Sequence, residues 1–204
     1  PNADRPPLTP TTTTAYIFKS TTVYHPTHPD LTIGLSNVKR SLFSTPLCYM
    51  GYAGYLNPFT LESQINSKIP TLNLVTTILH ETAHQMGYAS EKEANFIAYQ
   101  SAIKNDDPYI RYAGYSFALR YFFSELYAID RRKAKDLAEK INSGVLNNLK
   151  ETSDFWKKYE NPFEMIFEKT YNTYLKANGE SSGLKSYNEM VGLVINYHKN
   201  IGEF

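Results

Sequence analysis

Apolar residues recur at helical spacing through most of the chain after its first third. From Leu72 onward they follow one another at intervals of three and four residues, and Gly, Pro, Asn or Asp separates one run from the next. This period is typical of helices that bury one face. The pattern predicts helices over residues 73–86, 91–104, 108–129, 131–149, 162–177 and 184–198.

The beginning of the chain has a different pattern. Residues 1–40 are rich in proline and threonine, and proline restricts them to extended pieces because it lacks an N–H donor and fixes φ. Residues 15–23 could form a strand. Residues 42–66 alternate glycine, tyrosine and apolar residues, which favours one or two short strands. We therefore expect an α+β fold that is mainly α, with a small sheet built only from the first 70 residues.

Length and composition limit the domain organisation. With 204 residues, of which 42% are hydrophobic, the chain can bury a full core as one domain. We expect residues 41–204 to form this domain. Residues 1–40 are expected to be an extended N-terminal segment that either belongs to the domain or acts as a linker.

Charge and cysteine content exclude some classes of protein. The net charge of +1 gives no reason to expect a nucleic acid as partner. The one cysteine, Cys48, excludes an intrachain disulfide framework and is expected to be a buried thiol. No stretch qualifies as a membrane span. The nearest, residues 112–129, contains Arg120 and Glu125 and is predicted to be a buried aromatic helix.

The candidate chemistry lies at the end of the first predicted helix, in the run His80-Glu81-Thr82-Ala83-His84. Residues four apart lie on the same helix face, so both imidazoles can bind one metal ion. Glu81 lies beside them and can act on a water molecule at that metal. This is the arrangement of zinc hydrolases. The alternative is a surface helix that carries two histidines by chance, and the position of the motif on a predicted helix favours the metal site.

A third ligand is expected shortly after the motif. Gly87 is a natural helix end, so the chain can turn sharply there. Ser90 and Glu93 have the spacing of a capping box, which would use the Glu93 carboxylate locally. A zinc ion held by two histidines needs another protein ligand, and we expect Glu91 to supply it, with Glu93 as the rival. Asn95, one turn after Glu91, could accept the N–H of a bound histidine.

These motifs resemble a known group of enzymes. H-E-x-x-H followed by E-x-x-A-[D/N] is similar to the gluzincin zinc metallopeptidases, in which the glutamate of the second motif is the third ligand. Glu91, Ala94 and Asn95 match that motif. The chain departs from the gluzincin pattern by an asparagine in place of the usual aspartate and by a short gap between the motifs.

A more specific resemblance extends over roughly residues 38–200. The sequence from His80 to Phe96 (HETAHQMGYASEKEANF) is similar to that of a bacterial family of uncharacterised, membrane-anchored zinc peptidases. The resemblance implies a zincin-like helical domain, a Zn²⁺ cofactor and a peptide or protein substrate. It also implies membrane spans ahead of this region. This chain would then be a soluble fragment of a membrane-tethered protein whose catalytic domain is extracytoplasmic.

A peptidase needs further parts, for which the chain offers candidates. An extended substrate usually pairs with an exposed strand edge. Residues 51–57, including Tyr55 and Asn57, could supply this edge, or they could form an ordinary hairpin packed on the helices. The tetrahedral intermediate needs a hydrogen-bond donor. Tyr187 and His198 are candidates because of their type and their late position, although a structural role is the more common one for such residues.

The motifs and composition are compatible with two main classes of function. The first is a zinc-dependent metallopeptidase, in which Glu81 activates a water bound to the zinc ion. The alternative is a metal-stabilised, non-catalytic, membrane-tethered interaction module. Glu81 argues against the alternative, because a purely structural site does not need that carboxylate and usually has four ligands rich in cysteine. A hydrolase that acts on bonds other than peptide bonds is a weaker third option.

Overall fold

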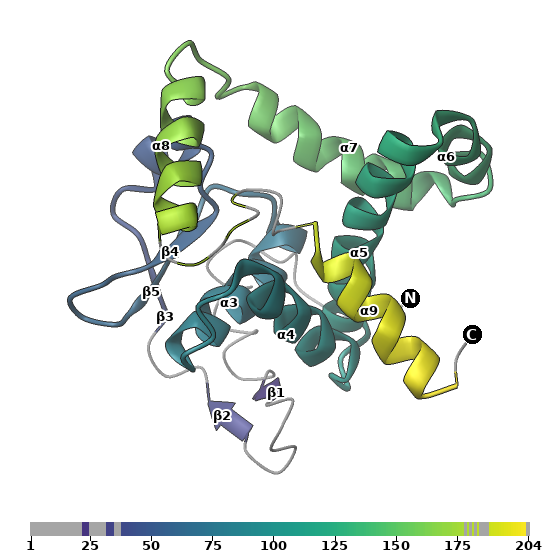
Figure 1. Cartoon of the computed structure of the whole chain (residues 1–204), viewed down its shortest axis with the longest axis horizontal. Helices are drawn as coiled ribbons and strands as arrows, with labels where there is room; N and C mark the ends of the chain where they lie inside the picture. The colour runs from purple at the N-terminus through teal and green to yellow at the C-terminus, as the bar shows by residue number, and fades with distance from the viewer. Residues whose placement is uncertain are drawn as a thin grey trace, which may run out of the picture.

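The computed structural model describes residues 22–24, 32–34, 38–177, 179, 181, 183 and 188–202. Within them the fold is mainly helical, with small sheets near the N-terminus, as the sequence predicted (Figure 1). The strands are β1 (Thr22–Tyr24), β2 (Thr32–Gly34), β3 (Val38–Arg40), β4 (Gly54–Leu56) and β5 (Ser63–Ile65). The helices are α2 (Ser44–Met50), α3 (Thr71–Gln85), α4 (Glu91–Ile103), α5 (Pro108–Ile129), α6 (Arg131–Ala138), α7 (Ser143–Lys157), α8 (Glu164–Ala177) and α9 (Met190–Asn200).

The larger sheet has three strands in the order β3-β5-β4. β3 runs parallel to β5, with Val38 opposite Ser63, and β4 runs antiparallel to β5, with Gly54 opposite Ile65. In the described part of the chain β4 pairs with β5 alone, so it is an edge strand. β1 and β2 form a separate antiparallel pair. All these strands precede residue 66, which confirms the expected position of the sheet.

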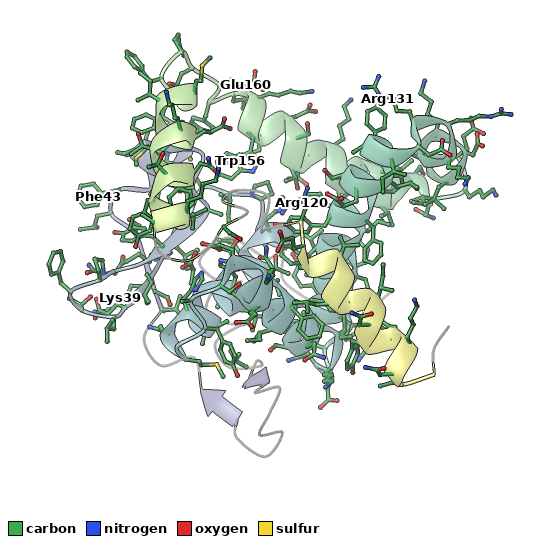
Figure 2. All side chains as sticks on the ribbon, viewed as in Figure 1. Lys39, Phe43, Arg120, Arg131, Trp156 and Glu160 are labelled. Carbon is green, nitrogen blue, oxygen red and sulfur yellow. The ribbon has the colours of Figure 1, made fainter. Side chains whose placement is uncertain are left out.

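An ion pair fixes the outer end of this sheet. Lys39 of β3 bonds through its Nζ to the carboxylate of Glu62, which lies in the loop between β4 and β5. Figure 2 shows the Lys39 side chain at the outer side of the sheet region. Both side chains are accessible to solvent, so the pair contributes little to stability. Its main effect is on the position of the loop that leads into β5.

The centre of the core lies between α3 and α4. Their buried positions follow the spacing of three and four residues that predicted these helices. α5 approaches α4 closely because Gly114 has no side chain: a Cβ there would lie 2.6 Å from the Ala102 Cβ. The main contributors are Leu74, Val75, Ile78, Leu79 and Ala83 of α3, Ala94, Ile97, Ala98 and Ala102 of α4, and Ile110 and Ala113 of α5.

Two elements differ from the sequence prediction. Residues 44–50 form helix α2 inside a segment for which only strands were expected, because Ser44, Leu47 and Cys48 face the core at helical spacing. The helix expected over 131–149 is interrupted. α6 ends at Ala138, and α7 starts at Ser143 and continues to Lys157. The reason is Asn142, whose side-chain oxygen accepts a hydrogen bond of 2.8 Å from the Gly144 N–H and so starts a new helix.

Other expectations fall at the chain ends or concern single residues. The last helix spans Met190–Asn200, later than expected. Residues 184–187 lie outside the described residues, as does most of the expected 1–40 segment. Cys48 is a buried free thiol, as predicted. Among the helices that the structure describes, none combines the length with the apolar character needed to cross a bilayer.

Candidate metal centre

The last two turns of α3 carry both histidines of the motif. His80 and His84 lie one turn apart, and their Nε2 atoms are 3.1 Å from each other. The side chains are 11% and 14% exposed, respectively. Ser63 of β5 holds this part of α3 against the sheet, because its hydroxyl donates a hydrogen bond of 2.9 Å to the carbonyl of Glu81. The motif is therefore fixed between the sheet and α4.

Glu91 approaches the histidines from the start of α4. Gly87 has φ +95°, a conformation that glycine adopts without steric cost, and the chain reverses there between the two helices. The turn brings Glu91 Oε2 to 3.2 Å from His80 Nε2 and 3.5 Å from His84 Nε2. The three possible ligand atoms all lie within 4.8 Å of one another. Glu93 is exposed on another face of α4, so the structure brings Glu91, and not its rival, to the histidines.

These residues fit a metal ion of the zinc type. Two imidazole nitrogens and one carboxylate oxygen are ligands that zinc prefers, and three protein ligands leave a position open for water or substrate. Glu91 Oε2 is buried, and within the described part of the chain its polar neighbours are the Nε2 atoms of the two histidines, with which it makes no hydrogen bond of good geometry. A buried carboxylate oxygen is costly without a partner. A cation held by the three side chains would satisfy it.

A backbone carbonyl orients one of the two histidines. His84 Nδ1 lies 2.7 Å from the carbonyl oxygen of Tyr88. A carbonyl can only accept, so Nδ1 carries the proton and the Nε2 of a neutral ring keeps its lone pair for a metal. Sequence reasoning assigned this kind of role to Asn95 and missed Tyr88, because a backbone acceptor has no signature in the residue types.

The charges around His84 favour its protonated form when no metal is bound. Burial disfavours the imidazolium, but the carboxylates of Glu91 and Glu81 and the Tyr88 carbonyl outweigh this effect and raise the pKa of His84 to about 9. The same contacts act in the opposite direction on Glu91. Although burial opposes it, the two histidines hold the pKa of the Glu91 carboxyl well below its usual range. The centre thus carries a proton that a metal would displace.

Glu81 lies beside the three candidate ligands and is 5% exposed. Burial raises the pKa of its carboxyl, with a further small contribution from the charge of Glu91, whereas His80 and His84 act in the opposite direction. Gly54 of β4 packs directly on this side chain: a Cβ at Gly54 would lie 2.7 Å from Glu81 Oε1. The edge strand of the sheet therefore contacts the carboxylate.

The capping box expected at the start of α4 does not form. Ser90 has the backbone conformation of an N-cap residue, with φ −76° and ψ 127°, but its side chain makes no capping hydrogen bond. Its hydroxyl is buried and has no hydrogen-bond partner among the described residues. Glu93, which the box required to bond back to Ser90, is exposed. The sharp turn at Gly87, and not a cap that occupies Glu93, determines which glutamate faces the histidines.

The candidates for substrate binding lie at or next to the edge strand. Tyr55 is in β4, opposite Gln64, and is half-buried. The Asn57 side chain accepts hydrogen bonds from the Phe59 N–H at 2.9 Å and the Thr60 N–H at 3.3 Å. It therefore shapes the loop after β4. Asn95 is buried on α4, one turn beyond Glu91, and its orienting role stays a prediction.

The two late candidates are placed differently. Tyr187 lies outside the described residues. His198 is on α9, and its Nε2 lies 2.6 Å from the hydroxyl of Tyr99. Tyr99 follows Glu91 by eight residues in the same helix, a rise of about 12 Å. This placement argues for a structural role of His198 in the contact of α9 with α4.

One functional candidate was missed by sequence reasoning. Tyr171 of α8 donates a hydrogen bond of 3.0 Å from its hydroxyl to Glu91 Oε1. The two residues are 80 positions apart in the sequence. Tyrosine is abundant in this chain, with 17 residues, so neither spacing nor composition distinguishes Tyr171.

Zinc uptake by the metal-free protein is expected to release about one proton per chain at pH 7, because zinc binds only the neutral imidazole. The pKa of His84 is raised to about 9, so at pH 7 this side chain carries the proton that must leave. Titration calorimetry in buffers with different ionisation enthalpies measures this number. The number of protons released should fall as the pH rises through 9. A heat of binding at pH 7 that does not depend on the buffer would contradict the expectation.

Comparison with known proteins gives one positive finding. A family described as "Protein of unknown function (DUF3810)" matches residues 3–195. No curated protein and no solved structure matches the chain.

Proposed function

The chain belongs to the DUF3810 family, whose function is unknown, and we propose that it is a zinc-dependent metallopeptidase of gluzincin type. One observation carries the proposal. His80 Nε2, His84 Nε2 and Glu91 Oε2 converge next to a fourth side chain, the buried carboxylate of Glu81, which is not needed as a ligand. A purely structural zinc site usually has four protein ligands and several cysteines. Three ligands with an adjacent carboxylate suit hydrolysis.

In this proposal His80, His84 and Glu91 hold the zinc ion. The Tyr88 carbonyl orients His84, and Asn95 serves the same purpose for a bound histidine. When bound, zinc polarises the peptide carbonyl and lowers the pKa of its water toward about 7. The protein contributes a fixed, largely dry setting in which these electrostatic effects are stronger than in water.

Glu81 is the proton carrier. Its carboxylate takes a proton from the water whose oxygen attacks the carbonyl carbon, and it then gives that proton to the nitrogen of the leaving amine as the C–N bond breaks. Burial raises the pKa of Glu81, which makes the carboxylate a stronger base. This shift therefore supports the role of a group that must both accept and return a proton.

The substrate in this proposal is an extended peptide or protein segment. The edge of β4 that pairs with no other described strand offers backbone groups for pairing, and Gly54 of that strand lies against Glu81. A peptide that pairs with β4 would thus run past the carboxylate. Tyr55 and Asn57 belong to this edge and to the loop after it. No nucleic acid is expected as a partner.

We also propose a tether to a membrane, ahead of this part of the protein, with the catalytic domain outside the cytoplasm. This part of the proposal rests on the resemblance to membrane-anchored zinc peptidases. The described helices do not include a span that could act as the anchor.

A non-catalytic, metal-stabilised interaction module is the second candidate. The observation in its favour is the burial of the centre, because Glu81 and Glu91 are only 5% and 4% exposed. The test is hydrolysis of a peptide library by the protein after removal of metal with a chelator and after restoration with zinc. A peptidase cleaves only in the second case, whereas an interaction module cleaves in neither.

Changing Gly54 to alanine is expected to lower this peptide hydrolysis at least about 10-fold, a change of about 1.4 kcal/mol in the barrier. The new Cβ would lie 2.7 Å from Glu81 Oε1 and 3.1 Å from the Gln64 carbonyl oxygen, so Glu81 must move. Small displacements of a catalytic group are costly. Zinc content should be unchanged.

The matched control is Gly192→Ala on α9, where an added Cβ meets nothing within 4 Å. This variant should cleave the library at the rate of the parent protein. Equal rates for Gly54→Ala and Gly192→Ala would contradict the proposed contact between β4 and the proton carrier.

A further inference from the structure

The two oxygens of Glu91 have different surroundings. Oε2 faces the Nε2 atoms of both histidines, at 3.2 and 3.5 Å. Oε1 points away from them and accepts the hydrogen bond of 3.0 Å from the Tyr171 hydroxyl. An ionised carboxylate is an acceptor only, so the tyrosine donates. This bond fixes the rotation of the carboxylate with Oε2 toward the candidate metal position.

Tyr171 is itself held by the part of the chain that leads into the edge strand. Its ring packs edge-on against Tyr52, with centroids 5.2 Å apart and an interplanar angle of 61°. The Tyr52 carbonyl accepts a hydrogen bond of 3.1 Å from Asn66 Nδ2, and Asn66 is fully buried. The hydroxyl of Tyr171 thus bonds to Glu91 from a ring that contacts a fixed part of the fold.

The other side chains of α8 bury little apolar surface, so they explain little of the position of Tyr171. Several of its large apolar side chains are exposed, among them Met165 at 76% and Ile166 at 60%. Leu175 is the buried hydrophobic residue that the described part of this helix contributes. Figure 1 shows α8 on the side of the molecule where β4 lies, away from the α5–α6 end. The contact of Tyr171 with Glu91 is therefore a main connection between α8 and the centre, and not a consequence of deep burial of the helix.

We propose that Tyr171 is a positioning residue of the metal centre, which acts through Glu91 and does not bind the metal itself. Partners of this kind orient ligating carboxylates, and their loss typically costs 10- to 100-fold in metal affinity. The inference rests on the metal site of the proposed function but not on peptide hydrolysis.

The test measures zinc affinity by competition with a chelator in the whole 204-residue chain. Tyr171→Phe keeps the ring and its contact with Tyr52 but removes the donor, and we expect zinc to bind about 10-fold more weakly or worse. Tyr174→Phe is the matched control, since it makes the same change on the same helix at a side chain that is 60% exposed, and it keeps the ring that stacks on Tyr171. We expect its affinity to stay within about twofold of the parent's, as for other exposed positions.

A double-mutant cycle distinguishes positioning from general damage to α8. If Tyr171 acts through Glu91, Tyr171→Phe has no further effect on zinc affinity in the Glu91→Ala background. Equal losses in both backgrounds, or no loss in the parent background, would overturn the proposal. Zinc binding that depends on Tyr171 in a protein that cleaves no peptide would retain this inference and contradict only the peptidase function. A parent protein without zinc affinity would overturn both.

Discussion

Glu81→Gln is expected to leave zinc binding and folding intact and to reduce peptide hydrolysis by at least about 10²-fold. Glutamine has nearly the same shape, so the close contact with Gly54 is preserved. It cannot accept the proton of the attacking water, and no other described carboxylate except the proposed ligand Glu91 lies in the cluster. Because burial raises the pKa of Glu81, a neutral side chain should not lower the free energy of unfolding.

Zinc content by plasma emission, thermal unfolding and cleavage of a peptide library are the three measurements for this variant. Glu93→Gln is the control, because it makes the same chemical change at an exposed position of α4 and should cleave like the parent. If Glu81→Gln cleaves as fast as the parent protein, Glu81 is not the proton carrier and the proposed mechanism is wrong.

Glu91→Ala is expected to weaken zinc binding by at least about 100-fold, more than the loss of a partner that only orients a ligand. The substitution removes one of the three proposed ligand atoms. It also removes the acceptor of the Tyr171 hydrogen bond and the carboxylate beside His84. Competition titrations with a chelator at fixed pH measure the change.

Glu93→Ala is the informative comparison for the same titration. The sequence pattern suggested a loss of about 1 kcal/mol from a broken capping box. The structure revises this value, because Ser90 makes no capping bond and Glu93 is exposed. We expect a change in the free energy of unfolding within about 0.5 kcal/mol and an unchanged zinc affinity. Loss of zinc in Glu93→Ala with retention in Glu91→Ala would exchange the two assignments.

The sequence predicted the local parts of the centre well because their geometry is local. The spacing of His80 and His84 is a property of any α-helix, and the turn at Gly87 limits where the next helix can start. Even here one step was wrong: the expected cap at Ser90 does not form. Glu91 was chosen partly for a reason that the structure does not support, and the geometry of the turn is what brings it to the histidines.

Contacts between distant segments could not be predicted in the same way. Tyr171 meets Glu91 only because α8 packs near α2 and Tyr52, and no periodicity in the sequence encodes this arrangement. His198 was a candidate donor because of its type and late position, with a structural role as the alternative. Tertiary packing places it against Tyr99, which favours that alternative. For α2, three apolar or small residues at helical spacing outweighed the alternation of glycine and tyrosine that favoured strands.

Anomalous X-ray diffraction at the zinc absorption edge, from crystals of the zinc-loaded protein, locates the metal independently of any activity. We expect one zinc peak per chain, about 2.0–2.2 Å from His80 Nε2, His84 Nε2 and a carboxylate oxygen of Glu91, with Glu81 near but not bound. A peak at other residues, or none in protein that has been saturated with zinc, would contradict this expectation.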